Sequence, residues 1–153
     1  MRKTDHIIRN ETPNDYSAVE NLTREAFWNV YRPGCTEHYV LHCFRDDPAF
    51  VPELDLVLEQ NGQLVGHILY VRAALETDDG RTLPILTFGP LSIDPSHQKQ
   101  GLGKLLVDAS LEKAAGLGFG AVAITGNLAF YGRSGFVTGK SRNIRYADDP
   151  EAD

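Results

Sequence analysis

The stretch LSIDPSHQKQGLGKLL, residues 91–106, decides how the chain folds. An apolar run leads into it, and Gly101 and Gly103 then open a helix. The first amides of a helix have no intrahelical partner and carry the positive end of its dipole, so they attract anions. Lys99 and Lys104 add positive charge to an otherwise acidic chain. The stretch therefore predicts a cradle for a phosphate or pyrophosphate group.

Two better-known glycine-rich motifs do not fit this stretch. A Walker A loop needs a glycine where Gln98 stands, and a serine or threonine where Leu105 stands. A dinucleotide fingerprint needs a third small residue where Leu106 stands, and it belongs on the first strand of a βαβ unit. A further alternative stays open, in which the glycines only make a tight turn into a helix.

The composition is that of one ordinary globular domain, and we expect a single domain over residues 1–153. Twenty-one acidic and fifteen basic side chains give a formal charge of −6, which argues against nucleic acid or an anionic membrane as partner. The N-terminus MRKTDHIIRN has no signal-peptide pattern, so we expect a cytoplasmic protein. Cys35 and Cys43 would stay reduced there.

The segments outside this stretch predict a mixed α/β domain. Alternating branched residues with turn signals at Asn61-Gly62 and Asp79-Gly80 indicate three consecutive antiparallel strands up to Ile93. Helical spacing predicts helices over 13–27, 36–45 and 100–117, and the apolar stripe of the last comprises Leu102, Leu105, Leu106, Ala109 and Leu117. The remaining expected elements are a strand over 6–9, a parallel strand in GAVAIT (120–125) and a short helix after it.

The order and spacing of these segments resemble the GCN5-related N-acetyltransferase (GNAT) superfamily. Its cofactor signature Gln/Arg-x-x-Gly-x-Gly/Ala is matched by Gln98, Gly101 and Gly103. Its tyrosine, followed after three residues by Gly-Phe, is matched by Tyr131 and Gly135-Phe136. The resemblance implies an α/β (α+β) fold, with a mixed, mostly antiparallel sheet of six to seven strands and about four helices, in which the fourth and fifth strands splay apart.

The resemblance covers about residues 6–138 and implies acetyl-CoA as co-substrate, lying in the gap between the splayed strands. Pro90 fits such a gap because a proline cannot donate to a strand ladder and demands a bulge or an edge. A simple edge-strand proline is the alternative. The residues implied for cofactor binding are Leu91, Ser92, Ile93, Gln98, Lys99, Gln100, Gly101, Leu102, Gly103, Lys104, Asn127 and Tyr131.

The function that the resemblance implies is transfer of an acetyl group from acetyl-CoA to a primary amine by direct attack. Tyr131 would be the catalytic residue and would protonate the departing thiolate of coenzyme A. The acceptor would be a small-molecule or peptide amine. The alternative is a non-catalytic acyl-CoA-binding regulatory module, because the segment 86–89 lacks the glutamate that many relatives carry on the fourth strand.

No general base is assigned from the sequence. An alkyl amine is almost entirely protonated at neutral pH, so some route for proton removal is expected. His67, Glu25 and Glu37 could act through water, but a structural role is favoured for each.

A cysteine and histidine cluster and the C-terminus need separate interpretation. Cys35, His38, His42 and Cys43 lie close in sequence, yet their spacing matches no usual zinc pattern, and no metal site is expected.

After Phe136 the family has two more strands, whereas only SRNIRY (141–146) could form one here. A second copy of the chain could supply a missing strand, which makes a homodimer possible.

Overall fold

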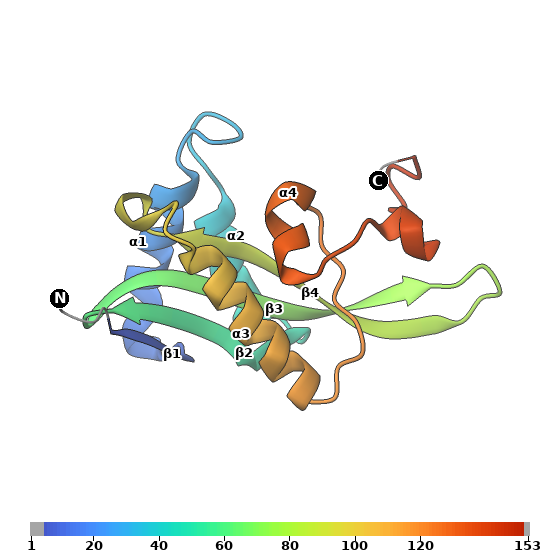
Figure 1. Cartoon of the computed structure of the whole chain (residues 1–153), viewed down its shortest axis with the longest axis horizontal. Coiled ribbons are helices and arrows are strands. Elements are labelled where there is room, and N and C mark those ends of the chain that lie inside the picture. Colours follow the sequence, from blue (N-terminus) through green and yellow to red (C-terminus); the bar gives the residue numbers. More distant parts are fainter. Residues whose placement is uncertain (1–4, 152–153) are drawn as a thin grey trace.

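A sheet of four antiparallel strands forms the centre of the computed structural model, which describes residues 5–151 (Figure 1). Residues 1–4, part of the N-terminal stretch searched for a signal peptide, and residues 152–153 lie outside this description. The strands follow one another in the sheet in the order of the chain. They are β1 (His6–Asn10), β2 (Phe50–Gln60), β3 (Gln63–Glu76) and β4 (Thr82–Ile93).

Tight turns set the register of the strands, as the sequence predicted. Asn61 and Gly62 both have positive φ angles, 52° and 81°, which is the backbone of a two-residue hairpin turn between β2 and β3. The longer turn between β3 and β4 contains Gly80 at a φ of 86°. All three neighbouring strand pairs are antiparallel.

Helices cover both faces of the sheet, with α3 on one face and α1 and α2 on the other (Figure 1). Among residues 5–151, no helix is both long and apolar enough to cross a membrane. The α-helices are α1 (Tyr16–Phe27), α2 (Glu37–Phe44), α3 (Leu102–Gly116) and α4 (Leu128–Tyr131). Short 3-10 turns cover Pro13–Asp15, Pro95–His97, Gly132–Ser134 and Gly139–Arg142.

Helix α3 buries a different stripe from the one that the sequence indicated. Leu102 and Leu106 are buried as expected, and Ala114 continues their row at intervals of four residues. Leu105 and Leu117 remain 40% and 47% exposed, so placing them on the buried stripe was wrong. The helix lies on an open sheet that contacts only one side of it.

Within residues 5–151 the sheet has four strands, so the expected six to seven are wrong. The segment GAVAIT forms a parallel bridge between Val122 and Leu86, which gives the predicted direction but no strand. In the described part of the chain, 137–151 contains a 3-10 turn and a small bridge, and SRNIRY is not a strand. A strand needs a continuous edge to pair with, and this polar segment has too few apolar residues to hold one in place.

Candidate active site

The candidate site begins at a bulge in β4. Ile68 pairs with Leu91 and Tyr70 pairs with Phe88, so Gly89-Pro90 on β4 lies opposite a single residue of β3. The Gly89-Pro90 peptide bond is cis. This register shift confirms the bulge predicted at Pro90. A proline favours a bulge because it has no amide hydrogen to donate to the neighbouring strand.

The C-terminal half of β4 has a free outer edge. The amide of Asp94 donates to the carbonyl of Val65 on β3, at 2.8 Å, so it points into the sheet. Because backbone groups alternate along a strand, those of Leu91 and Ile93 point outward. On the other side of the bulge, Leu86 exchanges two hydrogen bonds with the segment 121–123. Within residues 5–151, no further backbone hydrogen bond joins this segment to β4, so the two part after Leu86.

The side chain of Ser92 lies on the face of the sheet that α1 covers. Its hydroxyl donates to the hydroxyl of Thr23 on α1, at 3.1 Å, and its side chain is buried there. By the same alternation, its backbone groups face β3. The structure therefore places the backbone groups of Leu91 and Ile93 at the free edge of β4, and those of Ser92 between β4 and β3.

The connection from β4 to α3 leaves the N-terminus of α3 without a side-chain cap. Gly101 is the N-cap residue at a φ of 78°, and no side chain caps the helix. Lys99 also has a positive φ, 63°. The side-chain amide of Gln98 donates to the carbonyl of Ile93, at 3.1 Å, and so ties the connection back to β4. The first amides of α3 are left for an external acceptor.

The side chains around this helix end contribute unequal charge. Lys104 forms an ion pair with Asp108 one helical turn further on, which offsets much of its positive charge. Lys99 has no ion pair among the described residues. Gln100 is exposed and Leu102 is buried, so the latter anchors the start of the helix. The proposed cradle is therefore mainly backbone.

Gly103 lets the start of α3 approach α4 closely. A Cβ atom there would lie 3.0 Å from Phe130 Cζ and 3.8 Å from Ile93 Cγ1. Any larger residue would separate the helix from this contact. The second glycine of the motif thus brings the cradle next to the short helix that carries Tyr131.

Gly126 and Asn127, the two residues that precede α4, position Tyr131. The side-chain oxygen of Asn127 accepts from the amide of Ala129, at 2.8 Å, and its carbonyl accepts from the amide of Tyr131, at 2.9 Å. Asn127 therefore serves as a helix cap. A Cβ on Gly126 would lie 2.5 Å from Tyr131 Cε2, so only glycine fits beneath the ring. The role of Gly126 was not predicted, because its only signal in the sequence is its place before the cap.

The ring of Tyr131 lies in an aromatic cluster. Its centroid is 4.9 Å from that of Phe130, 5.6 Å from Phe88 and 5.8 Å from Phe136. The contact with Phe136 explains the spacing of the tyrosine and the following Gly-Phe pair. Burial raises the pKa of the Tyr131 phenol, and nearby Tyr31 adds to this. The phenol is therefore protonated at neutral pH.

His67 lies in a different, charged cluster under α1 and α2. Its Nε2 is 2.7 Å from Asp55 Oδ1 and 3.4 Å from Glu11 Oε2, and its side chain is fully buried. Burial opposes a charge on His67, but the hydrogen bonds to both carboxylates prevail and raise its pKa. A fully buried, doubly paired histidine cannot take a proton from an acceptor amine that approaches from solvent. Its role is structural.

The two carboxylates of this cluster titrate differently. Burial raises the pKa of Asp55 to about 6. Burial also acts against ionised Glu11, but hydrogen bonds from His67 and Asp55 lower its pKa to about 2. Glu11, Asp55 and His67 could together offer ligands to a metal ion, a grouping that the sequence did not reveal. Arg45, 2.6 Å from Glu11, already supplies a balancing positive charge there.

The other base candidates and the cysteine and histidine cluster are dispersed. Glu25 is exposed beside Arg24, and the carboxylate of Glu37 accepts from the amide of Thr36. Cys35 Sγ lies 3.4 Å from His38 Nδ1. His42 pairs instead with Glu20, at 2.7 Å, and Cys43 is exposed.

Comparison with known proteins identifies the family. The sequence profile of the Acetyltransferase (GNAT) family matches residues 18–136. The chain belongs to this family. It is similar to the uncharacterized N-acetyltransferase YhbS of Escherichia coli K12, with 27% identity over 139 residues, 91% of this chain and 78% of that protein. The uncharacterized N-acetyltransferase YjhQ of the same strain is 33% identical over 92 residues, 60% of this chain and 50% of that protein.

Solved structures of GNAT proteins agree with the observed fold. A GNAT family acetyltransferase from Brucella melitensis, in complex with acetyl-CoA, superposes with a TM-score of 0.77 and 29% identity over 88% of this chain and 84% of that chain. E. coli YhbS, in complex with CoA, superposes with a TM-score of 0.82 and 25% identity over 99% and 81%. The GNAT assignment therefore rests on sequence and fold together.

Proposed function

We propose that this GNAT protein transfers the acetyl group of acetyl-CoA to a primary amine. One observation carries the proposal: the free edge of β4, the bare N-terminus of α3 and the ring of Tyr131 meet at one place. The contact between Gly103 and Phe130 joins the helix end to α4, and Ile93 lies beside both. The extended pantetheine arm of coenzyme A needs the backbone groups of a free strand edge. Its pyrophosphate needs free amides at a helix N-terminus.

The residues present fit coenzyme A. The outward backbone groups of Leu91 and Ile93 would pair with the amides of its pantetheine arm. The amides of 98–104 would receive its pyrophosphate, with Lys99 as the nearby cation. Two solved relatives in the family bind acetyl-CoA or CoA, which supports this assignment.

The chemistry follows from one thioester and one phenol. Bound acetyl-CoA supplies a carbonyl carbon that the amine nitrogen attacks, so that a C–N bond forms and the C–S bond breaks. The Tyr131 phenol donates its proton to the departing sulfur and regains a proton from water, and the new amide releases its extra proton to solvent. For ordinary pKa values of phenol and thiol, this donation is uphill by about 2 kcal/mol, and the raised pKa of Tyr131 adds to that cost. Such a cost is compatible with a general acid.

The acceptor, the assembly and the compartment belong to the proposal. We expect a small-molecule or peptide amine as acceptor, and neither nucleic acid nor membrane as partner. A homodimer stays a prediction, supported by the missing strands beyond β4. The cytoplasm is the proposed location because it holds acyl-CoA co-substrates.

Release of free thiol from acetyl-CoA with a panel of amines tests the proposal. Tyr131→Phe should lower kcat by about 10²- to 10⁴-fold, because it removes only the acidic hydroxyl. Calorimetric binding of acetyl-CoA should not change. Tyr146→Phe, at an exposed tyrosine near the C-terminus, is the matched control.

Three outcomes would contradict different parts of the proposal. Full activity of the Tyr131→Phe variant would remove the general-acid role. Binding of acetyl-CoA without turnover of any amine would support the non-catalytic module instead. No binding by the folded protein would show that the cleft is not a coenzyme A site.

A further inference from the structure

The phenol that the proposed reaction needs is carried by a short element. Tyr131 is the last residue of α4, which has only four residues. Among the residues that the structure describes, no hydrogen bond holds the hydroxyl of Tyr131. A helix of one turn has little rigidity of its own. The contacts of the Tyr131 ring must therefore decide where its hydroxyl lies.

One of these ring contacts comes from β4, directly before the bulge. The centroids of the Phe88 and Tyr131 rings are 5.6 Å apart, and Phe88 immediately precedes Gly89-Pro90. The other two rings beside Tyr131 do not belong to the sheet, because Phe130 lies on α4 itself and Phe136 follows it in the chain. Within residues 5–151, the ring of Phe88 is thus the one that joins the phenol to the strand whose free edge would hold coenzyme A.

Tyr70 supports Phe88 from the neighbouring strand. The two residues are paired in the register of β3 and β4, and their ring centroids are 5.1 Å apart. The Tyr70 hydroxyl lies 2.7 Å from Ser110 Oγ on α3. Because the Ser110 hydroxyl donates to the carbonyl of Val107, at 2.8 Å, the proton between the two hydroxyls comes from Tyr70. Both hydroxyls are fully buried, so the Tyr70 ring cannot shift without losing this bond.

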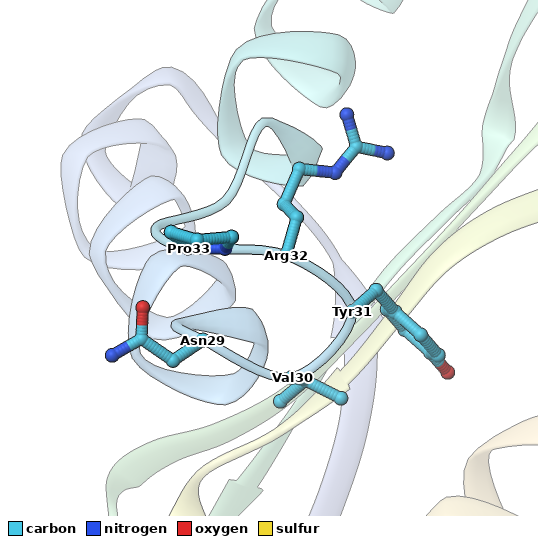
Figure 2. Close-up of a pocket in the computed structure, with 5 residues that line it drawn as sticks. All are labelled: Asn29, Val30, Tyr31, Arg32 and Pro33. Carbon is cyan, nitrogen blue, oxygen red and sulfur yellow. The ribbon is translucent and has the colours of Figure 1, made fainter.

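An exposed tyrosine shows what such support adds. Tyr31 extends out of the loop 29–33 and is 75% exposed (Figure 2). In the described part of the chain its ring contacts one other ring, that of Phe27, with centroids 6.2 Å apart. A ring with one neighbour can turn without losing much contact. The rings of Tyr70 and Phe88 are buried in the core, where close packing restricts their positions.

We propose that Phe88 and Tyr70 are positioning residues for the general acid: Phe88 holds the Tyr131 ring at the bulge in β4, and Tyr70, anchored on Ser110, holds Phe88. This inference rests on the proposed acetyltransferase function. It assigns the placement of the phenol to two residues that lie in the core of the sheet and that are not among the proposed cofactor-binding residues.

Turnover of Phe88→Leu tests the role of the first residue. Leucine keeps the position apolar but removes the ring, so kcat should fall about 10- to 100-fold because the Tyr131 hydroxyl is misplaced. The KM for the amine and the calorimetric Kd for acetyl-CoA should change by less than about threefold. Phe119→Leu is the matched control, because Phe119 packs against the same core without a ring contact to Tyr131 among the described residues. It should retain the wild-type kcat.

A double variant shows whether Phe88 acts through the phenol. If it does, Phe88→Leu should lower the kcat of the Tyr131→Phe protein by less than about twofold, because the hydroxyl that Phe88 positions is already absent. Equal fold losses in the two backgrounds would overturn the inference, since a general disturbance of the structure acts in both.

Graded changes at Tyr70 test the second residue. Tyr70→Phe keeps the ring and loses the hydrogen bond to Ser110, so kcat should fall only about two- to fivefold. Tyr70→Leu removes the ring and should approach the loss of Phe88→Leu. Wild-type turnover of Tyr70→Leu would overturn the role of Tyr70. If Phe88→Leu does not fold, Tyr70→Phe, which removes a single oxygen atom, takes its place in the double variant.

Ultraviolet titration of the Tyr131 phenol tests the inference without turnover. Burial raises the pKa of this phenol, and the titratable groups that interact with it electrostatically include Tyr31 and Tyr70. In Phe88→Leu more water reaches the phenol, so its pKa should fall towards the ordinary value. The difference between each protein and its Tyr131→Phe counterpart isolates this one phenol. Phe119→Leu should titrate as the wild type does.

The outcomes separate this inference from the proposed function. If the wild-type chain acetylates no amine, the proposed function fails, and the titration alone decides whether Phe88 covers and holds the phenol. An unchanged titration in folded Phe88→Leu, or an unchanged kcat in a protein that is otherwise active, would overturn the inference and leave the proposed function standing.

Discussion

The two faces of the sheet hold their helices by different means. On the α3 face, a continuous apolar core ends in the aromatic cluster around Tyr131. On the α1 and α2 face, a smaller apolar cluster lies beside buried charged groups, among them Glu11, Arg45 and His67. Both faces contain titratable groups with shifted pKa values, but their surroundings differ in kind.

The difference shows which shifted pKa belongs to chemistry. The ring of Tyr131 is surrounded by other rings, one of them Phe88 beside the bulge in β4, and its side chain is only partly buried. The carboxylates of Asp55 and Glu11 are buried, and they pair with His67 and Arg45. Perturbed pKa values mark functional sites only when the group can be reached. The charged cluster is therefore a structural device that fixes α2 to the sheet.

The largest expected effect on this comparison comes from removing the buried cation. Arg45 is 6% exposed in its side chain and pairs with Glu11, which is fully buried. Arg45→Met should lower the free energy of unfolding by about 3–5 kcal/mol, because it removes the nearest cation from a buried carboxylate. Chemical denaturation measures the loss. Arg145→Met, which breaks an exposed pair with Asp78, should cost close to nothing.

The cause of that loss can be isolated with a double variant. Adding Glu11→Gln to Arg45→Met removes the stranded charge and should recover part of the stability. Equal stability of the single and double variants would mean that Arg45 acts through its packing over the Tyr16 ring, 4.0 Å away.

The second-largest effect should be on the pH dependence of the free energy of unfolding, when Asp55 is replaced by a neutral residue. The folded chain keeps a proton on Asp55 up to about pH 6, whereas an unfolded aspartate releases it near 3.8. The folded state binds more protons in this window, so its stability falls as pH rises, by up to about 1.4 kcal/mol per pH unit. Asp55→Asn should flatten the fall between pH 4 and 6.

The other two titratable residues of the charged cluster, His67 and Glu11, change the stability in different pH ranges. His67, with its raised pKa, also loses its contribution as pH rises, but at higher pH. Glu11, with its lowered pKa, loses its contribution as pH falls towards about 2. Asp148→Asn, at an exposed carboxylate, is the control. An unchanged slope in Asp55→Asn would show that Asp55 does not hold the buried proton.

On the other face, a smaller loss should follow from a methyl group under Tyr131. Gly126→Ala places a Cβ 2.5 Å from the ring and should cost about 1–3 kcal/mol of unfolding free energy. It should also lower turnover by displacing the phenol. Gly116→Ala, where a Cβ meets nothing within 4 Å, should not destabilise. Gly126→Ala with Tyr131→Ala should cost no more than Tyr131→Ala alone.

The smallest expected effect is at the N-terminus of α3. Gly101→Ala meets no neighbouring atom, but a side chain at a φ of 78° is strained, so about 1 kcal/mol should be lost in thermal unfolding. Gly120→Ala has neither a neighbour nor a positive φ and is the control. Equal stability of both variants would mean that the turn can relax without glycine.

Much of the fold was predictable because it depends on local signals. Turn residues such as Asn61-Gly62 set the hairpins, and Pro90 marks the bulge. The number of strands was not predictable in this way. The segment 120–125 has the pattern of a strand, but it pairs at one point only because β4 bends away from it after Leu86.

The candidate site was predictable in its motifs and only partly in its contacts. The glycines and Tyr131 were found by spacing, but Ser92 faces α1, Lys104 is paired with Asp108, and Asn127 caps a helix. The contact of Ser92 joins residues 69 positions apart, which the spacing of motifs along the chain does not reveal. The contacts of Lys104 and Asn127 are local, and the i,i+4 and helix-cap patterns in the sequence were sufficient to indicate them.

The sequence by itself determined the family, the order of the elements and the two motifs, because turn chemistry, helix caps and glycine spacing are local. Only the tertiary structure decided which backbone edge stays open, which aromatic rings surround Tyr131, and that His67 is buried among charges. These properties depend on long-range packing, where a bulge at Gly89-Pro90 redirects the outer edge of β4 and a missing Cβ at Gly126 admits a ring.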